Sequence, residues 1–117
     1  MNDQAIEQEI QAKGLSAPRI TPADVTMNIQ SEHYFTAGDG VVGVKPGCAV
    51  CYPASLGLLT FCVLVLQNGF TVTGESACAS PENFDPEIGR KIARQNAEQK
   101  IWPLMGYELK QRLRDAK

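Results

Sequence analysis

The stretch from Leu58 to Gly74 constrains the fold of this chain most. Leu58 to Leu66 is apolar apart from Thr60. Because both alternating sets of positions are apolar, the run predicts a strand covered on both faces. Asn68-Gly69 follows, the pair that best tolerates the positive φ angles of a type I′ turn. Phe70 to Gly74 then alternates apolar side chains with threonines. These residues predict a β-hairpin over about 58–75.

Two helices are predicted after the hairpin. Asp85-Pro86-Glu87 combines a capping side chain, a proline for the first helical position and an acid for the first turn. The apolar spacing predicts a helix over 86–102, with small residues that permit close approach to the sheet at Gly89, Ala93 and Ala97. Pro103 is expected to break this helix. A last helix is predicted over 104–114.

The N-terminal part predicts helices and a long loop. Thr21-Pro22-Ala23-Asp24 repeats the helix-start chemistry, so a helix is predicted over 22–32. A weaker helix is predicted over 3–13, inside an N-terminal segment, 1–20, that we expect to be flexible. Residues 36–57 are rich in glycine and proline and predict a loop. Within that loop a short strand could form at Val41, Val42 and Val44.

The fold class predicted from these elements is α+β, in one domain over 1–117. A small antiparallel sheet built on the 58–75 hairpin is packed by the C-terminal helices, with an N-terminal helix beside it. An isolated hairpin is marginal in water. We therefore expect either a third strand at 41–45 or strands from a second subunit, which favours a homodimer or a higher homo-oligomer.

Charge is distributed unevenly along the chain, whose net charge is −2. Residues 1–85 carry three basic and nine acidic side chains, and residues 86–117 carry eight and four. The basic third could bind an anion or could face the acidic part of the same protein. The longest apolar run is about half the length that spans a bilayer, and the first residues lack the pattern of a secretion signal. We expect a protein that stays in the cytoplasm, away from membranes.

A series of short motifs occurs in the order found in one known family. They include Ile20-Thr21-Pro22, Ser31-Glu32-His33-Tyr34-Phe35-Thr36, Asn68-Gly69-Phe70-Thr71-Val72, Asn83-Phe84-Asp85, Ile88-Gly89-Arg90-Lys91-Ile92-Ala93 and Ile101-Trp102-Pro103-Leu104. Together these resemble the small phage and prophage proteins grouped around gene 49 of one tailed phage and gene 66 of another. The resemblance implies a phage accessory protein made in the host bacterial cytoplasm. It implies no activity, because the family is largely uncharacterised.

Cysteine and histidine residues give two incomplete motifs. Cys48-x-x-Cys51 has the spacing of zinc ligands or of a redox dithiol. One pair is insufficient for a zinc site, and two loop thiols are the simpler interpretation. His33, the single histidine, could activate a cysteine only if the two met in space. The sequence therefore assigns no catalytic residue, no metal ligand and no cofactor.

Six residues form the candidate ligand-binding set: Asn83, Phe84, Arg90, Arg94, Asn96 and Trp102. The first two precede a helix whose positive N-terminus suits a phosphate, and arginine suits phosphate through its planar fork. Asn96 falls on the apolar side of the 86–102 helix, as an amide either satisfied internally or used to read a ligand. Each residue also has a structural interpretation. Glu87–Lys91 and Arg94–Glu98 are spaced as ion pairs, and Trp102 suits a core.

Three functions are compatible with these observations. The first is a phage accessory protein that binds and sequesters an anionic nucleotide-type signal, such as a cyclic nucleotide or an NAD-derived cyclic signal, and so counters host antiviral defence. The second is a non-enzymatic factor that binds and modulates a host protein through an exposed apolar patch. The third is a small nucleotide-acting enzyme using His33 or a cysteine. Nucleic-acid binding is disfavoured, since the chain is acidic and no aromatic residues interleave the basic ones.

Overall fold

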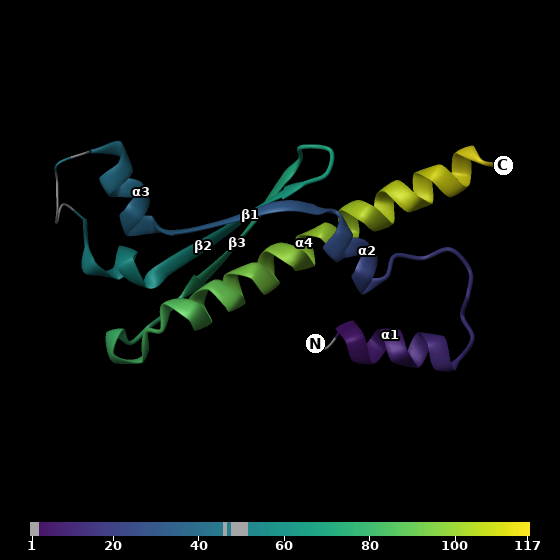
Figure 1. The fold of residues 1–117 in the computed structure, drawn as a ribbon, viewed down its shortest axis with the longest axis horizontal. Coiled ribbons are helices and arrows are strands. Elements are labelled where there is room, and N and C mark those ends of the chain that lie inside the picture. The colour runs from purple at the N-terminus through teal and green to yellow at the C-terminus, as the bar shows by residue number, and fades with distance from the viewer. Residues whose placement is uncertain (1–2, 46, 48–51) are drawn as a thin grey trace.

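A three-stranded antiparallel sheet carried on one long helix forms the body of the protein (Figure 1). The computed structural model describes residues 3–45, 47 and 52–117. In chain order its elements are α1 (Asp3–Ala12), α2 (Pro22–Met27), β1 (Ile29–Thr36), α3 (Ala37–Val44), the 3₁₀ turn η1 (Ala54–Leu58), β2 (Leu59–Leu66), β3 (Thr71–Ala77), the 3₁₀ turn η2 (Pro81–Asn83) and α4 (Pro86–Asp115). The predicted α+β class is confirmed.

The predicted hairpin is formed by β2 and β3, but its turn differs from the expected type. Gly69 adopts a φ of 89°. In the described chain only glycines take a positive φ, so Asn68 does not. Asn68 instead accepts a hydrogen bond from the backbone N–H of Phe70 through its side-chain oxygen, at 2.9 Å. A type I′ turn needs positive φ at both central residues. This longer turn needs only one, and glycine supplies it.

The third strand comes from a segment predicted to be helical. The helix expected over 22–32 ends at Met27, and β1 begins at Ile29. Asn28 marks the change of direction, because its side-chain and backbone oxygens both accept from the backbone N–H of Gln67 at the end of β2. β1 then pairs antiparallel along β2, with Tyr34 opposite Cys62. A second subunit is therefore not needed to complete the sheet.

Residues 37–44, where a loop or a short strand was expected, form the helix α3. A capping box starts it: the Thr36 hydroxyl accepts from the backbone N–H of Asp39 at 3.0 Å, and the Asp39 carboxylate accepts from the backbone N–H of Thr36 at 2.9 Å. This reciprocal cap satisfies two of the donors that a helix start leaves free. The cap therefore stabilises α3, although the glycines of this segment disfavour a helix.

α4 is one continuous helix, although two helices separated at Pro103 were predicted. Proline removes one backbone N–H and crowds the preceding turn. The helix continues because side chains on both sides of Pro103 are anchored in the same core: Ile101 is fully buried, and Met105 packs against that core. Figure 1 shows the last turns of α4 extending beyond the strands.

The core lies between α4 and one face of the sheet. Cys62, Leu64, Leu66 and Val72 point from the strands toward Ala93, Ala97 and Ile101 of α4. Gly74 of β3 sets the distance between the two layers. A Cβ atom at this position would lie 2.2 Å from the Ala93 carbonyl oxygen and 2.3 Å from the Ala97 backbone nitrogen. The small residues predicted to permit close approach to the sheet thus meet a glycine there.

The opposite face of the sheet is covered by no described helix, which corrects the expectation that β2 is covered on both faces. β2 alternates half-buried and buried residues along its whole length. Residues that pair across neighbouring strands lie on the same face of the sheet. The partners of the half-buried β2 residues therefore identify the other members of this face. We call it the open face, made by Ser31, His33, Phe35, Phe61, Val63, Val65, Thr71, Thr73 and Glu75.

The contact at Gly74 predicts a specific loss of stability. Gly74→Ala places a methyl group against the α4 backbone, so we expect the free energy of unfolding to fall by about 1–3 kcal/mol. The matched control is Gly106→Ala in α4, where an added Cβ meets no atom within 4 Å. Alanine there should raise the free energy of unfolding by about 0.5–1 kcal/mol. Urea denaturation followed by circular dichroism measures both, and equal effects would contradict the close contact.

Candidate functional site

The six residues of the candidate binding set do not meet at one place. Phe84 and Arg90 line a small hollow near the start of α4. Arg94 lies in an ion-pair cluster at the edge of the sheet, while Asn96 and Trp102 line a larger cleft farther along α4. Asn83 is exposed in η2 and lines none of these. The set is thus divided along a helix of 30 residues.

The hollow at the start of α4 is small and offers little to a phosphate. Its volume is about 140 Å³, and its lining residues include Tyr34, Phe35, Phe84 and Arg90. Asp85 caps α4, accepting from the backbone N–H groups of Glu87 at 2.9 Å and of Ile88 at 3.3 Å. A carboxylate therefore already occupies the positive end of the helix that a phosphate would use.

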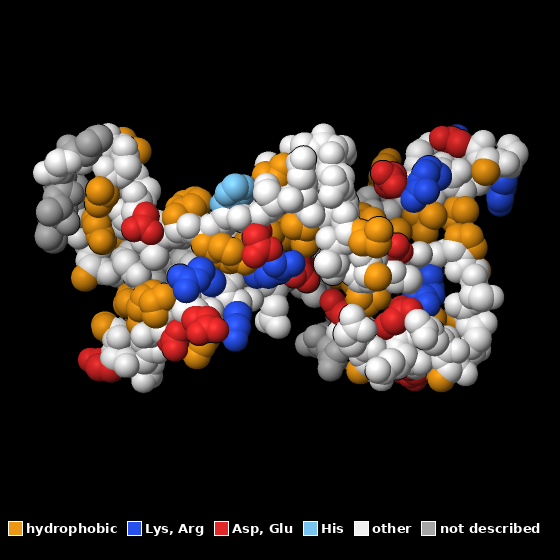
Figure 2. Space-filling view, viewed as in Figure 1, with side chains coloured by type: hydrophobic (Ala, Val, Ile, Leu, Met, Phe, Trp, Pro, Cys, Tyr) orange, Lys and Arg blue, Asp and Glu red, His pale blue; other side chains and the backbone are white. Residues whose placement is uncertain are grey.

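Arg94 is neutralised by two carboxylates. Its Nε donates to Glu98 Oε1 at 2.6 Å, and its Nη1 pairs with Glu32 Oε2. The hydrogen bond to Glu98 is the main cause that raises the Arg94 pKa above its ordinary value, and the charges of Glu98 and Glu32 add to it. The pairing of Arg94 with Glu98 and of Lys91 with Glu87, predicted from the sequence spacing, is observed. Figure 2 shows basic and acidic side chains lying side by side along α4.

The thiol of Cys62 is buried near the Arg94 ion pairs and is poorly suited to act as a nucleophile. Cys62 is fully buried, and burial raises the pKa of its thiol. Burial likewise raises the pKa of the neighbouring Tyr34 phenol to about 12, and the Tyr34 hydroxyl donates to Glu32 Oε1 at 3.1 Å. A nucleophilic cysteine needs a lowered pKa, so Cys62 is a core residue that stays protonated.

His33 lies on the other side of the sheet from Cys62. In the register of β1 and β2, His33 is opposite Val63 on the open face, whereas Cys62 points into the core. The His33 imidazole Nε2 lies 3.1 Å from the Ser31 hydroxyl. Cys78 donates through its Sγ to the carbonyl of Ser80 at 3.2 Å. His33 and Cys62 therefore cannot form a catalytic pair in this arrangement.

No group of three or more histidine, cysteine or carboxylate side chains is placed to hold a metal within residues 3–45, 47 and 52–117. Cys48 and Cys51 lie outside the described residues, so the zinc and dithiol interpretations of that pair stay predictions.

A cleft of about 720 Å³ lies where α1, α2 and α4 meet. We call it the α1–α4 cleft. Its walls combine four amides, two carboxylates and an indole with smaller side chains, namely Asp3, Gln4, Pro22, Val25, Thr26, Gln95, Asn96, Glu98, Gln99 and Trp102. This volume is in the range of small-molecule sites. No lysine or arginine is among the lining residues, and the Glu98 carboxylate is already paired with Arg94. The lining therefore offers a phosphate no basic partner, while Asp3 adds a carboxylate, so a neutral or cationic ligand is favoured over an anion.

Asn96 was expected to be buried, and the structure corrects this. It is exposed at the rim of the cleft, and its Nδ2 donates to the backbone carbonyl of Glu75 at 2.8 Å. The bond ties α4 to β3. One amide proton and the side-chain carbonyl remain for a second partner.

Several lining residues were not predicted from the sequence. Asp3, Gln4, Val25 and Thr26 come from α1 and α2, about 70 to 100 positions before their neighbours on α4. Only the lining residues on α4 could be related to one another from the sequence, through the periodicity of the helix. Gln99 lies one turn from both Asn96 and Trp102, and Gln95 lies one turn before Gln99, so these side chains share one side of a 3.6-residue helix.

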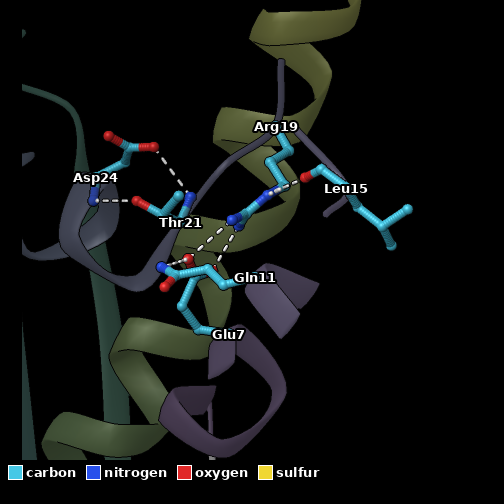
Figure 3. Close-up of polar contacts among 6 residues, drawn as sticks. All are labelled: Glu7, Gln11, Leu15, Arg19, Thr21 and Asp24. Atoms are coloured by element: carbon cyan, nitrogen blue, oxygen red, sulfur yellow. Dashed lines mark hydrogen bonds and ion pairs between the residues drawn. The ribbon is translucent and has the colours of Figure 1, made fainter. Parts of the chain in front are cut away.

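An ion pair, shown in Figure 3, anchors α1 to the segment that precedes α2, and Gln99 of α4 also donates to the Asp3 carboxylate at 3.4 Å. Arg19 Nη1 and Nη2 donate to the two oxygens of the Glu7 carboxylate at 2.5 and 2.8 Å, and Gln11 donates to the same carboxylate at 2.7 Å. The Arg19 hydrogen bonds are the main reason that the Glu7 pKa falls from 4.5 to about 2. This pairing positions α1 over a second hollow of about 280 Å³, lined by Ile6, Ile10, Ile20 and Trp102 among others.

The ion pair between Glu7 and Arg19 predicts acid-induced release of α1. The folded-state pKa of Glu7 lies below its ordinary value, so the stabilisation is complete above about pH 4.5 and is lost as the pH falls toward 2. Trp102 is the single tryptophan and lines both hollows beside α1. We expect its fluorescence to shift to the red over this pH range, before the far-ultraviolet circular dichroism of α4 is lost.

The matched variants are Glu7→Gln and Glu9→Gln. Glu7→Gln should give the shifted fluorescence already at pH 7, because Arg19 loses its partner. Glu9 makes only an exposed i, i+4 pair with Lys13, so Glu9→Gln should behave like the original protein. Identical pH profiles for all three proteins would exclude the ion pair as the anchor of α1.

Comparison with known protein families matches residues 20–113 to the phage protein (N4 Gp49/phage Sf6 gene 66) family. Searches of curated proteins and of solved structures found no match. None of the described helices has both the length and the apolar character to cross a membrane. The matched region covers well over half of the chain and includes α2, the whole sheet and nearly all of α4. The chain therefore belongs to the phage protein (N4 Gp49/phage Sf6 gene 66) family.

Proposed function

We propose that this phage protein binds and sequesters a small ligand in the α1–α4 cleft, with a neutral nucleoside or a cationic compound as the first candidate and an anionic nucleotide-type signal of host antiviral defence as the second. The observation that carries the proposal is the composition of the cleft. About 720 Å³ of space is bounded by the Trp102 ring and by the amides of Gln95, Asn96 and Gln99. An aromatic wall with a few convergent polar groups is typical of sites that orient a small organic molecule.

The individual groups suit the parts of a nucleoside. An indole ring can stack on a base, and amide side chains offer both a donor and an acceptor to its edge. The carboxylates of Asp3 and Glu98 can accept hydrogen bonds from sugar hydroxyls. Asn96 retains bonding capacity beyond its contact with the Glu75 carbonyl.

Charge restricts how an anionic ligand could bind. With two carboxylates and no basic side chain in the lining, the phosphates of a cyclic nucleotide would have to stay outside the cleft, in solvent. A neutral nucleoside or a cationic compound fits the same walls without this cost. The proposal therefore ranks a neutral or cationic ligand first and the anionic signal expected from the sequence second.

The two alternative functions depend on other features. Modulation of a host protein requires an exposed apolar surface, and the open face of the sheet is such a surface. A nucleotide-acting enzyme requires a nucleophile or a base within the site. In the described part of the chain His33 and Cys62 lie on opposite faces of the sheet, which leaves the enzymatic alternative with the weaker support.

Ligand binding is tested by thermal unfolding in the presence of adenosine, spermidine, a cyclic dinucleotide and a cyclic NAD-derived nucleotide. A ligand present at ten times its Kd raises the free energy of unfolding by about 1.4 kcal/mol, which corresponds to a Tm increase of several degrees. We expect adenosine or spermidine to give the largest shift. The proposal fails if none of the four changes the Tm and native mass spectrometry of protein from infected cells shows no bound small molecule.

A pair of glutamine variants locates the binding site. Gln95→Leu removes an amide from the cleft and keeps a good helix former. It should reduce the ligand-induced Tm shift at least by half. Gln111→Leu is the matched control, because Gln111 lies on the exposed last turns of α4 and bonds only to Asp115. Equal shifts in both variants would place the ligand elsewhere.

A further inference from the structure

The α1–α4 cleft adjoins the second hollow beside α1, and the two spaces differ in chemistry. Four residues line both of them: Asp3, Pro22, Gln99 and Trp102. We call the second space, of about 280 Å³, the apolar hollow, because three isoleucines complete most of its wall, namely Ile6, Ile10 and Ile20. The cleft is completed mainly by amides. A polar space and an apolar space therefore share one boundary, at Asp3 and Trp102.

One carboxylate at this boundary has no basic partner. The two spaces are lined by three carboxylates, of which Glu7 is held by both outer nitrogens of Arg19 and Glu98 accepts from Arg94. Asp3 is half-buried and accepts an amide N–H at 3.4 Å. Among the residues that the structure describes, no lysine or arginine pairs with it. The charge of Asp3 is thus available to a ligand.

The surroundings of Asp3 suit an organic cation. A positive group that enters between Asp3 and Trp102 can form a charge-assisted hydrogen bond with the carboxylate and lie over the face of the indole. Both contacts favour a cation over a neutral group. A nucleoside confined to the cleft would leave Asp3 without a cation.

The apolar hollow has room for the carbon skeleton of such a cation. Its volume corresponds to about nine groups the size of a water molecule, each of which takes up about 30 Å³. Ile10 and Ile20 are half-buried, and Ile6 is 41% exposed. An apolar group that fills the hollow removes these side chains from water, which favours binding. A polyamine would instead place further charges against the isoleucines, at a cost in desolvation.

We propose that the ligand of this site is an amphipathic organic monocation, whose charged group pairs with Asp3 beside Trp102 and whose apolar part fills the apolar hollow. This inference rests on the proposed function and narrows its ligand class to compounds such as alkylamines and arylalkylamines. The charge and two of the isoleucines come from α1. That helix therefore determines which class of ligand the site accepts.

A set of six-carbon and four-carbon probes tests this assignment on the full chain. Isothermal titration calorimetry at pH 7 gives the Kd of n-butylamine, n-hexylamine, 1-hexanol and hexanoate. Each additional CH₂ should lower the Kd about two- to fourfold, because it is buried in the apolar hollow. Hexanol and hexanoate should bind at least about fivefold more weakly than hexylamine, because they lack the positive charge.

Asp3→Asn tests the charged contact. It removes the charge and keeps the shape of the side chain, so the preference for hexylamine over hexanol should fall below about twofold, while the gain per CH₂ should remain. The matched control is Glu9→Gln. Glu9 lies on the same helix, lines neither space and pairs with Lys13, so this variant should bind like the original protein.

Ile6→Gln and Ile92→Gln test the apolar contact. The two isoleucines are equally exposed on helices, at 41% and 42%, but Ile92 lines neither space. Ile6→Gln should reduce the gain per CH₂ at least by half, and Ile92→Gln should not. An unchanged Trp102 emission maximum without ligand shows that α1 stays attached. If Ile6→Gln releases α1, Asp3→Asn decides, since it leaves the anchor between Glu7 and Arg19 intact.

Two results overturn the inference: hexylamine that binds no more tightly than butylamine, or a preference for hexylamine over hexanol that survives Asp3→Asn. If adenosine still binds and Gln95→Leu weakens it, the cleft remains a ligand site and only the amphipathic class is wrong. If none of the probes binds, the proposed function fails as well.

Discussion

The close contact between β3 and α4 determines how the rest of the molecule is arranged. Gly74 lets the sheet approach the α4 backbone at Ala93 and Ala97 so closely that no side chain fits between them. This short distance allows Asn96 to reach the Glu75 carbonyl and Arg94 to reach Glu32 at the edge strand. The helix is thus fixed both in position and in rotation. Its remaining sides are available for the core, the α1–α4 cleft and the charged surface.

Elements with strong local signals were predictable from the sequence. The hairpin follows from the apolar run of β2 and from Gly69, and the start of α4 follows from Asp85-Pro86. β1 was missed because the capping box at Thr21 predicts a helix, while no glycine or proline marks its end. The actual end depends on Asn28, whose oxygens bond to Gln67 almost forty residues later. The break predicted at Pro103 does not occur for a related reason. Packing of Ile101 and Met105 in the core outweighs the tendency of proline to end a helix.

The candidate site was predictable only in part. Asn96 could be selected because an amide on the apolar side of a predicted helix is unusual, although the structure places it at the surface. The lining residues on α1 and α2 could not be selected, because a cleft between distant segments leaves no periodic signal in the chain. Arg94 looked suited to bind an anion, yet its two carboxylate partners include Glu32 from β1, a strand the sequence did not reveal. The charge of the site therefore became apparent only from the tertiary structure.

The attachment of α1 has a consequence for how members of this family could differ. The family match begins at Ile20, whereas α1 supplies Asp3 and Gln4 to one wall of the cleft. A ten-residue helix joined through Glu7 and Arg19 can thus be exchanged or remodelled while the sheet and α4 remain as they are. Changes in α1 would therefore reshape one wall of the cleft, while the wall that α2 and α4 supply stays attached to the core.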